Sequence, residues 1–347
     1  MSTPSTSKTA STLPMDGARQ LCAAAGVGAP VDLVRVPGGK NNRVFRVDGA
    51  DGPFVLKCYF RHPEDPRDRL GAEWKFLSHA WARGVRCVPE PLACDTTLGM
   101  ALYSFVEGEK LSADAVSRSH VEEAARFVCA LNEGARDLSR LDPGSEACFS
   151  VSDHLERIDA RVQRLARLDE AAPFATEAEI FLADGLRPTW DRIKRRTLDV
   201  CETAGIAPDA GIPESEVIAS PSDFGFHNAL WAEGRGLVFL DFEYAGRDDP
   251  AKLAGDFFNC PEIPTPAEHF DLFVETLVYG LSLGKRAGTR MRSMRNAYRI
   301  KWACILLNDF LPHGDARRRF AEQGERSERC AMQLRKAQKM IEAAAAA

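Results

Sequence analysis

At 347 residues and with a formal net charge of −5 at pH 7, the chain is longer than one compact core usually requires, so two lobes are the natural expectation. Hydrophobic residues make up 45% and charged residues 27%, values far from those of disordered or membrane proteins. The net charge argues against a broad nucleic-acid interface, and no apolar run reaches the length of a membrane span. We therefore expect neither nucleic acid nor a membrane among the partners.

The N-terminal stretch MSTPSTSKTASTLP is rich in Ser and Thr and lacks the apolar core of a secretory signal. We expect residues 1–14 to form a disordered leader. The ten cysteines, spread from Cys22 to Cys330, show no CxxC pair and no metal-ligand spacing. This pattern favours a reduced, cytoplasmic protein over one held by disulfides or a metal cluster.

Residues 15–106 are predicted to form a small N-terminal lobe. Within it, RVFRV and PFVLKCY flank DGADG, which is typical of a β-hairpin. Apolar residues then recur at helical spacing in DRLGAEWKFLSHAWARG, so a helix follows these strands. Strand character returns in CVPEPLACDTTLGMALYSFVEG.

Residues 107–342 are predicted to form a larger lobe, followed by a short tail at 343–347. Its sequence consists mainly of long amphipathic helical stretches. The clear β interruption is SEVIASPSDFGFHNALWAEGRGLVFLDFEYAG, where short apolar strands flank a polar loop. We find no internal repeat.

The segment VPGGKNNRVFRV places two glycines and two asparagines between strand-like segments. Gly38, Gly39, Asn41 and Asn42 would suit a backbone that approaches phosphate groups closely. A single glycine loop is common, however, and does not identify such a site by itself.

Lys57 stands in the middle of the predicted strand PFVLKCY, on the same face as Val55 and Tyr59. This is an unusual place for a solvated lysine. Glu73, on the helix sixteen residues later, could supply the ion pair that holds a lysine against nucleotide phosphates. The alternative is that Lys57 simply reaches the edge of the sheet.

Two carboxylates stand out in the β interruption: Asp223, five positions before Asn228, and Asp241, which directly follows the strand GLVFL. An enzyme that phosphorylates hydroxyl groups needs one carboxylate to accept a proton and oxygen ligands for magnesium. Asp223, Asn228 and Asp241 could supply both sets. The alternative is that these residues cap turns and end a strand.

Taken in order, the glycine loop, strand lysine, helix glutamate, YSFVEGEKL, SDFGFHN and LDFEYAG resemble the aminoglycoside phosphotransferase and choline kinase superfamily. The resemblance runs from about Val36 to Phe258. It implies a bilobal, protein-kinase-like α+β fold, in which a small antiparallel sheet with one helix precedes a larger, mainly helical lobe.

The same resemblance implies roles for individual residues. Asp223 would be the catalytic base, and Asn228 and Asp241 would bind Mg²⁺. Lys57, positioned by Glu73, would contact the nucleotide phosphates, and the backbone of Ser104, Phe105 and Val106 would meet the adenine, with Tyr103 and Phe105 as apolar walls. The implied nucleotide-binding residues are Gly38, Gly39, Asn41, Asn42, Lys57, Glu73, Ser104, Phe105 and Val106.

The sequence departs from the family pattern in two places. Many members have His-Gly-Asp where Pro221 and Ser222 precede Asp223 here, so the histidine that braces the loop is missing. His227 could replace it or could only pack.

The second departure follows the strand aspartate. The family pattern Asp-Pro-x-x-Asp is broken in GRDDPAKLAGDFF, where Leu253 stands in the place of the second aspartate. Asp249 and Asp256 are therefore structural candidates.

The acceptor-binding part of the second lobe gives mixed signals. Tyr298 and Trp302 could form an aromatic wall for a cationic amine, although their helical spacing equally fits core packing. The basic run at 284–295 could attract an anion or form a solvated helix face. Acidic residues that could instead attract an amine are Glu243, Glu262, Asp271 and Glu275.

We expect an ATP-dependent phosphotransferase that moves the γ-phosphate to a hydroxyl of a small molecule, such as a sugar, an amino alcohol or an aminoglycoside-like compound. Mg²⁺ would be the cofactor, and GTP could replace ATP. The alternatives are a protein Ser/Thr kinase and a catalytically silent nucleotide-binding module.

Overall fold

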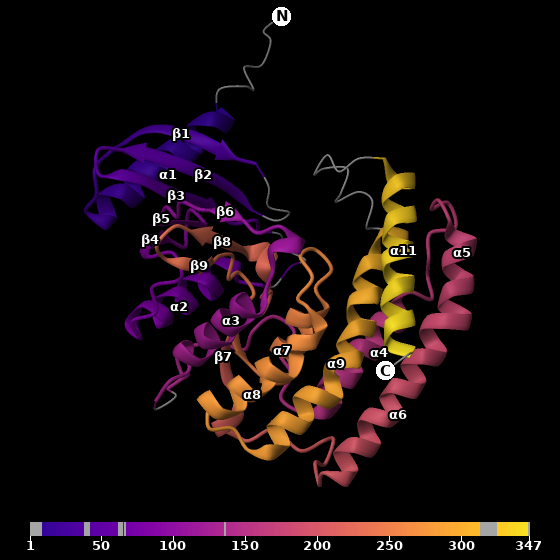
Figure 1. Cartoon of the computed structure of the whole chain (residues 1–347). Helices are drawn as coiled ribbons and strands as arrows, with labels where there is room; N and C mark the ends of the chain where they lie inside the picture. Colours follow the sequence, from indigo (N-terminus) through magenta and orange to yellow (C-terminus); the bar gives the residue numbers. More distant parts are fainter. Residues whose placement is uncertain are drawn as a thin grey trace, which may run out of the picture.

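The chain forms a lobe built around an antiparallel sheet, followed by a larger, mainly helical lobe (Figure 1). The computed structural model describes residues 9–37, 42–61, 65, 67–134, 137–312 and 325–345. Its α+β, bilobal arrangement confirms the predicted fold class. Across these residues, no helix is both long and apolar enough to cross a membrane. The ten cysteines, all of them within the described stretches, are free thiols.

Five antiparallel strands form the N-terminal sheet in the order β1-β2-β3-β5-β4. They are β1 (Pro30–Val36), β2 (Arg43–Gly49), β3 (Gly52–Cys58), β4 (Pro91–Asp95) and β5 (Met100–Ser104). The predicted hairpin is confirmed, because β2 and β3 pair along their whole length up to Gly49 and Gly52. Gly52 has a φ of 105°, a backbone conformation that favours glycine and lets the chain reverse here.

Helix α1 (Thr9–Ala25) packs against one face of this sheet, and the sequence did not predict it. Leu21 in α1 and Val47 in β2 belong to the same buried apolar cluster. Residues 9–14, which were expected to lie in a disordered leader, are therefore helical, while residues 1–8 lie outside the described part. Ser and Thr are weak helix formers, so the composition did not indicate a helix here. The apolar side of α1 becomes evident only where it packs against the sheet.

Helix α2 (Arg69–Ala82) follows β3 as predicted and packs against the strands β4 and β5. The carboxylate of Asp68 caps its first turn by accepting a backbone N–H over 2.9 Å. Gly84 follows the helix with a φ of 79°, the left-handed conformation at which many helices end. The buried side of the helix carries Phe76 and, among these apolar residues, the carboxylate of Glu73.

The second lobe consists mainly of helices, as its amphipathic stretches predict. Its α-helices are α3 (Arg118–Leu131), α4 (Val151–Arg164), α5 (Ala175–Ile180), α6 (Arg187–Thr203), α7 (Pro250–Asn259), α8 (Phe270–Gly280), α9 (Lys285–Leu306) and α11 (Arg326–Ala345). Helices α5 and α6 are joined by a π-helical segment, Phe181–Leu186. Helix α11 extends to Ala345, so residues 343–345 of the expected tail are helical.

Two small sheets lie among these helices and flank the polar loop 221–228. The strands are β6 (Glu109–Lys110), β7 (Ile218–Ser220), β8 (Ala229–Ala232), β9 (Gly236–Phe239) and β10 (Gly246–Asp248). The short strands predicted on either side of the loop are confirmed, but β7 pairs with β10, whereas β8 pairs with β6 and β9. The loop therefore passes from one sheet to the other.

A buried group of charges ties the helices of the second lobe together. Arg290 Nε lies 2.6 Å from Asp249 Oδ2, and its Nη2 lies 2.9 Å from Glu216 Oε2. The imidazole of His154 lies 3.1 Å from the same carboxylate of Asp249. Arg290, a member of the basic run 284–295, is thus part of the packing between helices and is buried away from any anionic ligand.

Tyr298 and Trp302 lie on α9 and bind polar groups of neighbouring helices. The Tyr298 hydroxyl lies 2.6 Å from His154 Nδ1, and Trp302 Nε1 donates to Asp256 Oδ1 over 3.0 Å. Lys301 also binds Asp256, at 2.8 Å. The packing interpretation is confirmed for Tyr298, which is buried in the core, whereas Trp302 is half-buried. Asp256 is a structural carboxylate, as expected.

We predict that Arg290→Met lowers the free energy of unfolding by about 3–5 kcal/mol at neutral pH, because it removes the guanidinium from the buried Glu216 and leaves Asp249 with His154 alone. Burial alone raises the pKa of Asp249, but His154 and Arg290 outweigh it and lower the pKa to about 2. The stabilisation is therefore complete above the unfolded pKa of about 3.9 and is lost as the pH falls through about 2.

Urea denaturation of wild type and variant between neutral pH and pH ~2 tests this prediction, because the difference in stability should shrink as Asp249 becomes protonated. The matched control is Arg292→Met on the same helix, whose exposed pair with Asp271 should contribute no more than about 1 kcal/mol. Equal effects of the two substitutions would contradict the structural role of Arg290.

Candidate functional site

Lys57 points from strand β3 into the interior and joins both lobes. Its Nζ lies 2.7 Å from Glu73 Oε2 on α2 and 2.5 Å from Asp241 Oδ1, which follows β9. The predicted pair with Glu73 is confirmed, and 7% of the lysine remains exposed, which rules out the sheet-edge alternative. Burial alone lowers the pKa of Lys57, but the neighbouring carboxylates outweigh it and raise the pKa. The ammonium group is therefore charged at neutral pH.

Two tyrosines help to hold Glu73 in place, and the sequence did not predict this contact. The Tyr59 hydroxyl lies 2.7 Å from Glu73 Oε2 and 2.7 Å from the Tyr103 hydroxyl. The backbone N–H of Phe242 donates to Glu73 Oε1 over 3.3 Å. The signal for Tyr59 was its strand alternation with Lys57, whereas Tyr103, expected as an adenine wall, is buried with its hydroxyl on Tyr59. Glu73 thus has a fixed position.

The polar loop brings Asp223 and Asn228 into direct contact. The Asn228 side-chain Nδ2 donates to the backbone carbonyl of Asp223 over 3.0 Å. The carbonyl of Asn228 accepts the N–H of Leu240 over 2.8 Å, which ties the loop to the residue before Asp241. The Asp223 side chain is 39% exposed, so its carboxylate is accessible from outside. The loop therefore holds Asp223 and Asn228 together and is bonded through the backbone to the residue before Asp241.

His227 lies against the candidate base. Its Nε2 is 3.6 Å from Asp223 Oδ1, and its Nδ1 is 3.4 Å from the thiol of Cys260. Burial lowers the pKa of His227, but Asp223 and Cys260 raise it to about 10. His227 therefore lies between two polar groups, a place that favours a brace over a purely apolar packing role.

Asp241 and Asn228 together offer the oxygen atoms that a hard cation requires. The Asp241 side chain is 41% exposed, and its Oδ2 is the carboxylate oxygen that Lys57 does not engage. Because Asn228 uses its nitrogen to hold Asp223, its amide oxygen is the atom that can ligate. Mg²⁺ typically takes one or two protein oxygens and completes its shell with water and phosphate, so the donor set fits it. The described residues contain no cluster of three or more His, Cys, Asp or Glu side chains suited to a metal ion.

Asn42 follows the glycine-rich segment and is anchored on both sides. Its amide nitrogen donates to the Glu243 carboxylate, and its Oδ1 accepts the N–H of Phe60 over 3.2 Å. Gly38, Gly39 and Asn41 lie outside the described residues. The described end of the predicted phosphate-binding loop therefore contacts the segment that follows Asp241.

The connection between the lobes contains Ser104, Phe105 and Val106. The N–H of Ser104 donates to the carbonyl of Glu90 over 2.9 Å, and its hydroxyl accepts the Glu90 N–H over 2.8 Å. The Ser104 N–H is therefore already used within the protein, and the adenine contact of Phe105 and Val106 stays a prediction. The guanidinium of Arg46 lies 4.9 Å from the centre of the Phe105 ring. The backbone N–H of Ser104 is therefore less suited to bind a nucleotide base than that of Phe105 or Val106.

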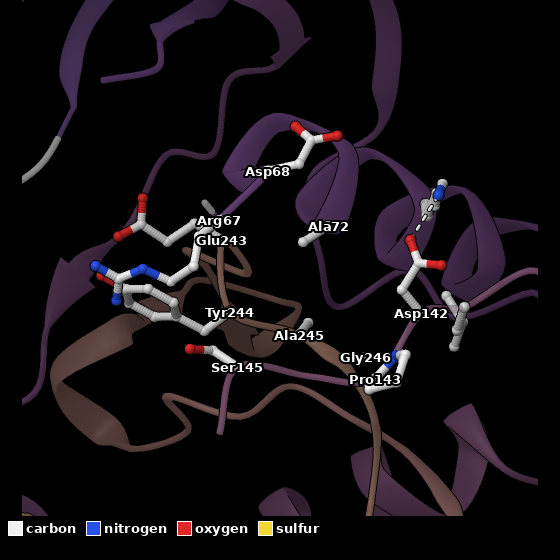
Figure 2. A pocket seen from close by; sticks show the side chains of 12 residues that line it. Arg67, Asp68, Ala72, Asp142, Pro143, Ser145, Glu243, Tyr244, Ala245 and Gly246 are labelled. Atoms are coloured by element: carbon white, nitrogen blue, oxygen red, sulfur yellow. Dashed lines mark hydrogen bonds and ion pairs between the residues drawn. The ribbon is translucent and has the colours of Figure 1, made fainter. Parts of the chain in front are cut away.

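A pocket of about 140 Å³ lies beside this site (Figure 2). Its wall is formed by the start of α2, the segment after α3 and residues 243–246. Figure 2 shows Arg67 beside the ring of Tyr244, and its guanidinium lies 5.5 Å from the ring centre. Across the pocket, Lys75 pairs with Asp142 at 2.6 Å. The aromatic face of Tyr244 is thus covered by a cation of the protein itself.

Solved structures with the same fold are similar over most of their length. A choline kinase from Cryptosporidium parvum is 12% identical with a TM-score of 0.54, and 90% of each chain is covered. A spectinomycin phosphotransferase is 12% identical with a TM-score of 0.60, covering 95% of this chain and 97% of the other. A macrolide 2'-phosphotransferase from Brachybacterium faecium is 17% identical with a TM-score of 0.55, covering 88% and 96%. No curated protein sequence matches the chain.

The sequence itself matches a family profile. Residues 32–252, more than half of the chain, match the profile described as the phosphotransferase enzyme family. This range contains the lysine on β3, the glutamate on α2, the loop 221–228 and the aspartate after β9 that the fold brings together. The chain therefore belongs to the phosphotransferase enzyme family.

Proposed function

We propose that the protein transfers the γ-phosphate of ATP to a hydroxyl group of a small molecule. The observation that carries this proposal is the position of Lys57, whose Nζ bridges Glu73 at 2.7 Å and Asp241 at 2.5 Å. In kinases, a lysine held by a helix glutamate contacts the nucleotide phosphates next to the metal-binding aspartate. The free thiols support a reducing compartment, and we place the activity in the cytoplasm.

In this proposal, each residue of the site performs one task. The Asp223 carboxylate orients the acceptor hydroxyl and takes its proton, while Asn228 holds the Asp223 backbone. Lys57 orients and neutralises the phosphates. Asn228 and Asp241 would hold Mg²⁺, which supplies charge neutralisation when bound. Positioning and electrostatic stabilisation then account for most of the acceleration, and no covalent phosphoenzyme is required.

A protein kinase would share this chemistry but needs a surface that holds a peptide. Here the chain passes from Asp241 through β10 directly into α7 at Pro250, which leaves little room for an activation segment. A catalytically silent nucleotide-binding module would need no complete set of Lys57, Asp223 and Asp241. We therefore favour a small-molecule acceptor over both alternatives.

The acceptor class is proposed to be a sugar, an amino alcohol or an aminoglycoside-like compound. The solved structures named above act on choline, spectinomycin and a macrolide. In this chain Tyr244 is covered by Arg67, and Tyr298 and Trp302 are engaged within the helical lobe. Because Arg67 covers the Tyr244 ring and Tyr298 is buried, two of these three aromatic residues are closed to a quaternary amine, which favours a neutral polyol or aminoglycoside hydroxyl.

A phosphate-transfer screen with ATP and GTP tests the proposal. The acceptors are choline, ethanolamine, monosaccharides, nucleosides and aminoglycosides, each assayed with and without Mg²⁺ and with Asp223→Asn as the matched inactive control. We expect Mg²⁺-dependent product with at least one alcohol. Phosphorylation of added proteins, with none of any small alcohol, would replace the proposal with the protein-kinase alternative.

A further inference from the structure

Ser222, directly before Asp223, has an unusual backbone. Its φ is 64°, a left-handed conformation that disfavours residues with a side chain. The family pattern has glycine at this place and histidine one position earlier, where Pro221 stands here. Serine therefore stands in a position that suits glycine, and it adds a hydroxyl group that glycine lacks.

The hydroxyl of Ser222 meets a buried ion pair. Lys252 Nζ donates to Ser222 Oγ over 2.9 Å and lies 2.7 Å from Asp248 Oδ2. Both charged residues are buried, with 3% of Lys252 and 0% of Asp248 exposed. The other carboxylate oxygen of Asp248 accepts the N–H groups of Cys148 and Asp249, each over 2.9 Å. The pair is therefore well satisfied and rigidly held.

Asp248 and Lys252 lie on two elements next to the polar loop 221–228. Asp248 ends strand β10, which pairs with β7, the strand that leads into the loop. Lys252 belongs to the first turn of α7, which packs against α9 in the centre of the helical lobe. Because hydrogen bonds from a charged donor are shorter and stronger than neutral ones, Lys252 can fix Ser222 to this core.

We propose that Lys252 is a positioning residue that fixes Asp223 for phosphoryl transfer, acting through the Ser222 hydroxyl and itself held by Asp248. Asp223 is then secured from both sides, since Asn228 Nδ2 binds its backbone carbonyl over 3.0 Å. Lys252 stands next to Leu253, where the family pattern has its second aspartate. The inference rests on the proposed function for its catalytic meaning.

Ser222→Ala tests the contact most cleanly, because it leaves the Lys252 and Asp248 pair in place and so preserves the fold. We expect kcat to fall about tenfold, as losing a charge-assisted hydrogen bond predicts, with little change in the KM of either substrate. Amide exchange of the 221–228 segment, followed by mass spectrometry, should accelerate by a similar factor. Ser293→Ala is the matched control, because its hydroxyl binds the Arg290 carbonyl away from the loop.

Lys252→Met should lower kcat by a similar factor and should also lower the melting temperature. In the double variant with Ser222→Ala the two losses in kcat should not add, because both remove the same contact. Lys301→Met is the control for a buried lysine, since it removes a pair with Asp256 and leaves the loop untouched. It should lower stability without accelerating exchange at 221–228.

The outcomes separate this inference from the proposed function. Wild-type kcat and wild-type loop exchange in Ser222→Ala, or fully additive losses in the double variant, would overturn the positioning role. Absence of phosphate transfer by the wild-type protein would overturn the proposed function. In that case the exchange measurement still decides whether Lys252 holds the loop, because it requires no turnover.

Discussion

Asp223→Asn is expected to reduce kcat by about 10³-fold, within the range that a general base contributes. Asparagine keeps the shape of the side chain, and the contact from Asn228 to the Asp223 backbone is preserved. What is lost is the carboxylate that accepts the proton of the acceptor hydroxyl. Since Asp223 is not proposed to touch the nucleotide, the affinity for Mg²⁺-ATP should change less than about threefold, a difference below 1 kcal/mol.

The measurement combines steady-state kinetics with isothermal titration of Mg²⁺-ATP. Asp199→Asn, at an exposed site on α6, controls for the loss of one negative charge. A variant with normal turnover would show that another group takes the proton. Loss of nucleotide binding in Asp223→Asn, with Asp199→Asn normal, would mean that Asp223 belongs to the nucleotide site.

Lys57→Met is expected to have the second large effect, and it should act on both catalysis and stability. The substitution removes the cation that holds Glu73 and Asp241 in place. Loss of one preorganised donor at the phosphates predicts a fall in kcat/KM for ATP of about 10²-fold or more. The uncompensated Glu73 carboxylate, of which 4% is exposed, predicts a loss of about 3–5 kcal/mol in the free energy of unfolding.

A second variant separates the two effects of Lys57. In Lys57→Met with Glu73→Gln, the buried carboxylate is neutral, so urea denaturation should recover much of the stability. Phosphate transfer should remain low, because the ammonium group is still missing. If the double variant regained both stability and turnover, Lys57 would have a structural role alone and the placement of the phosphates would be wrong.

The sequence predicted those parts of the site that follow from local periodicity. Strand alternation placed Lys57 on an inward face, and the helix that carries Glu73 was visible from its apolar spacing. The polar residues Asp223, Asn228 and Asp241 were recognisable because they stand between short apolar strands. The structure confirms the inward position of Lys57, because its ammonium group contacts residues on α2 and after β9.

Other parts of the site depend on contacts between residues that are far apart in the sequence. Such contacts produce no local sequence pattern. The Tyr59 and Tyr103 hydroxyls meet across two strands, and the use of the Ser104 N–H by Glu90 leaves no mark on residue type. Lys252 could not be connected with Ser222 from sequence, because the two meet only when β7 and β10 pair. Helix α1 was not predicted for a similar reason, because its apolar side packs against the sheet.

The most direct test follows the fate of the γ-phosphate by ³¹P nuclear magnetic resonance. Wild-type protein with Mg²⁺-ATP and the best acceptor of the screen should produce ADP and a phosphate monoester in equal amounts, and Asp223→Asn should produce neither at a comparable rate. Formation of ADP with inorganic phosphate alone, or of equal product by wild type and Asp223→Asn, would contradict phosphate transfer to a small-molecule hydroxyl at this site.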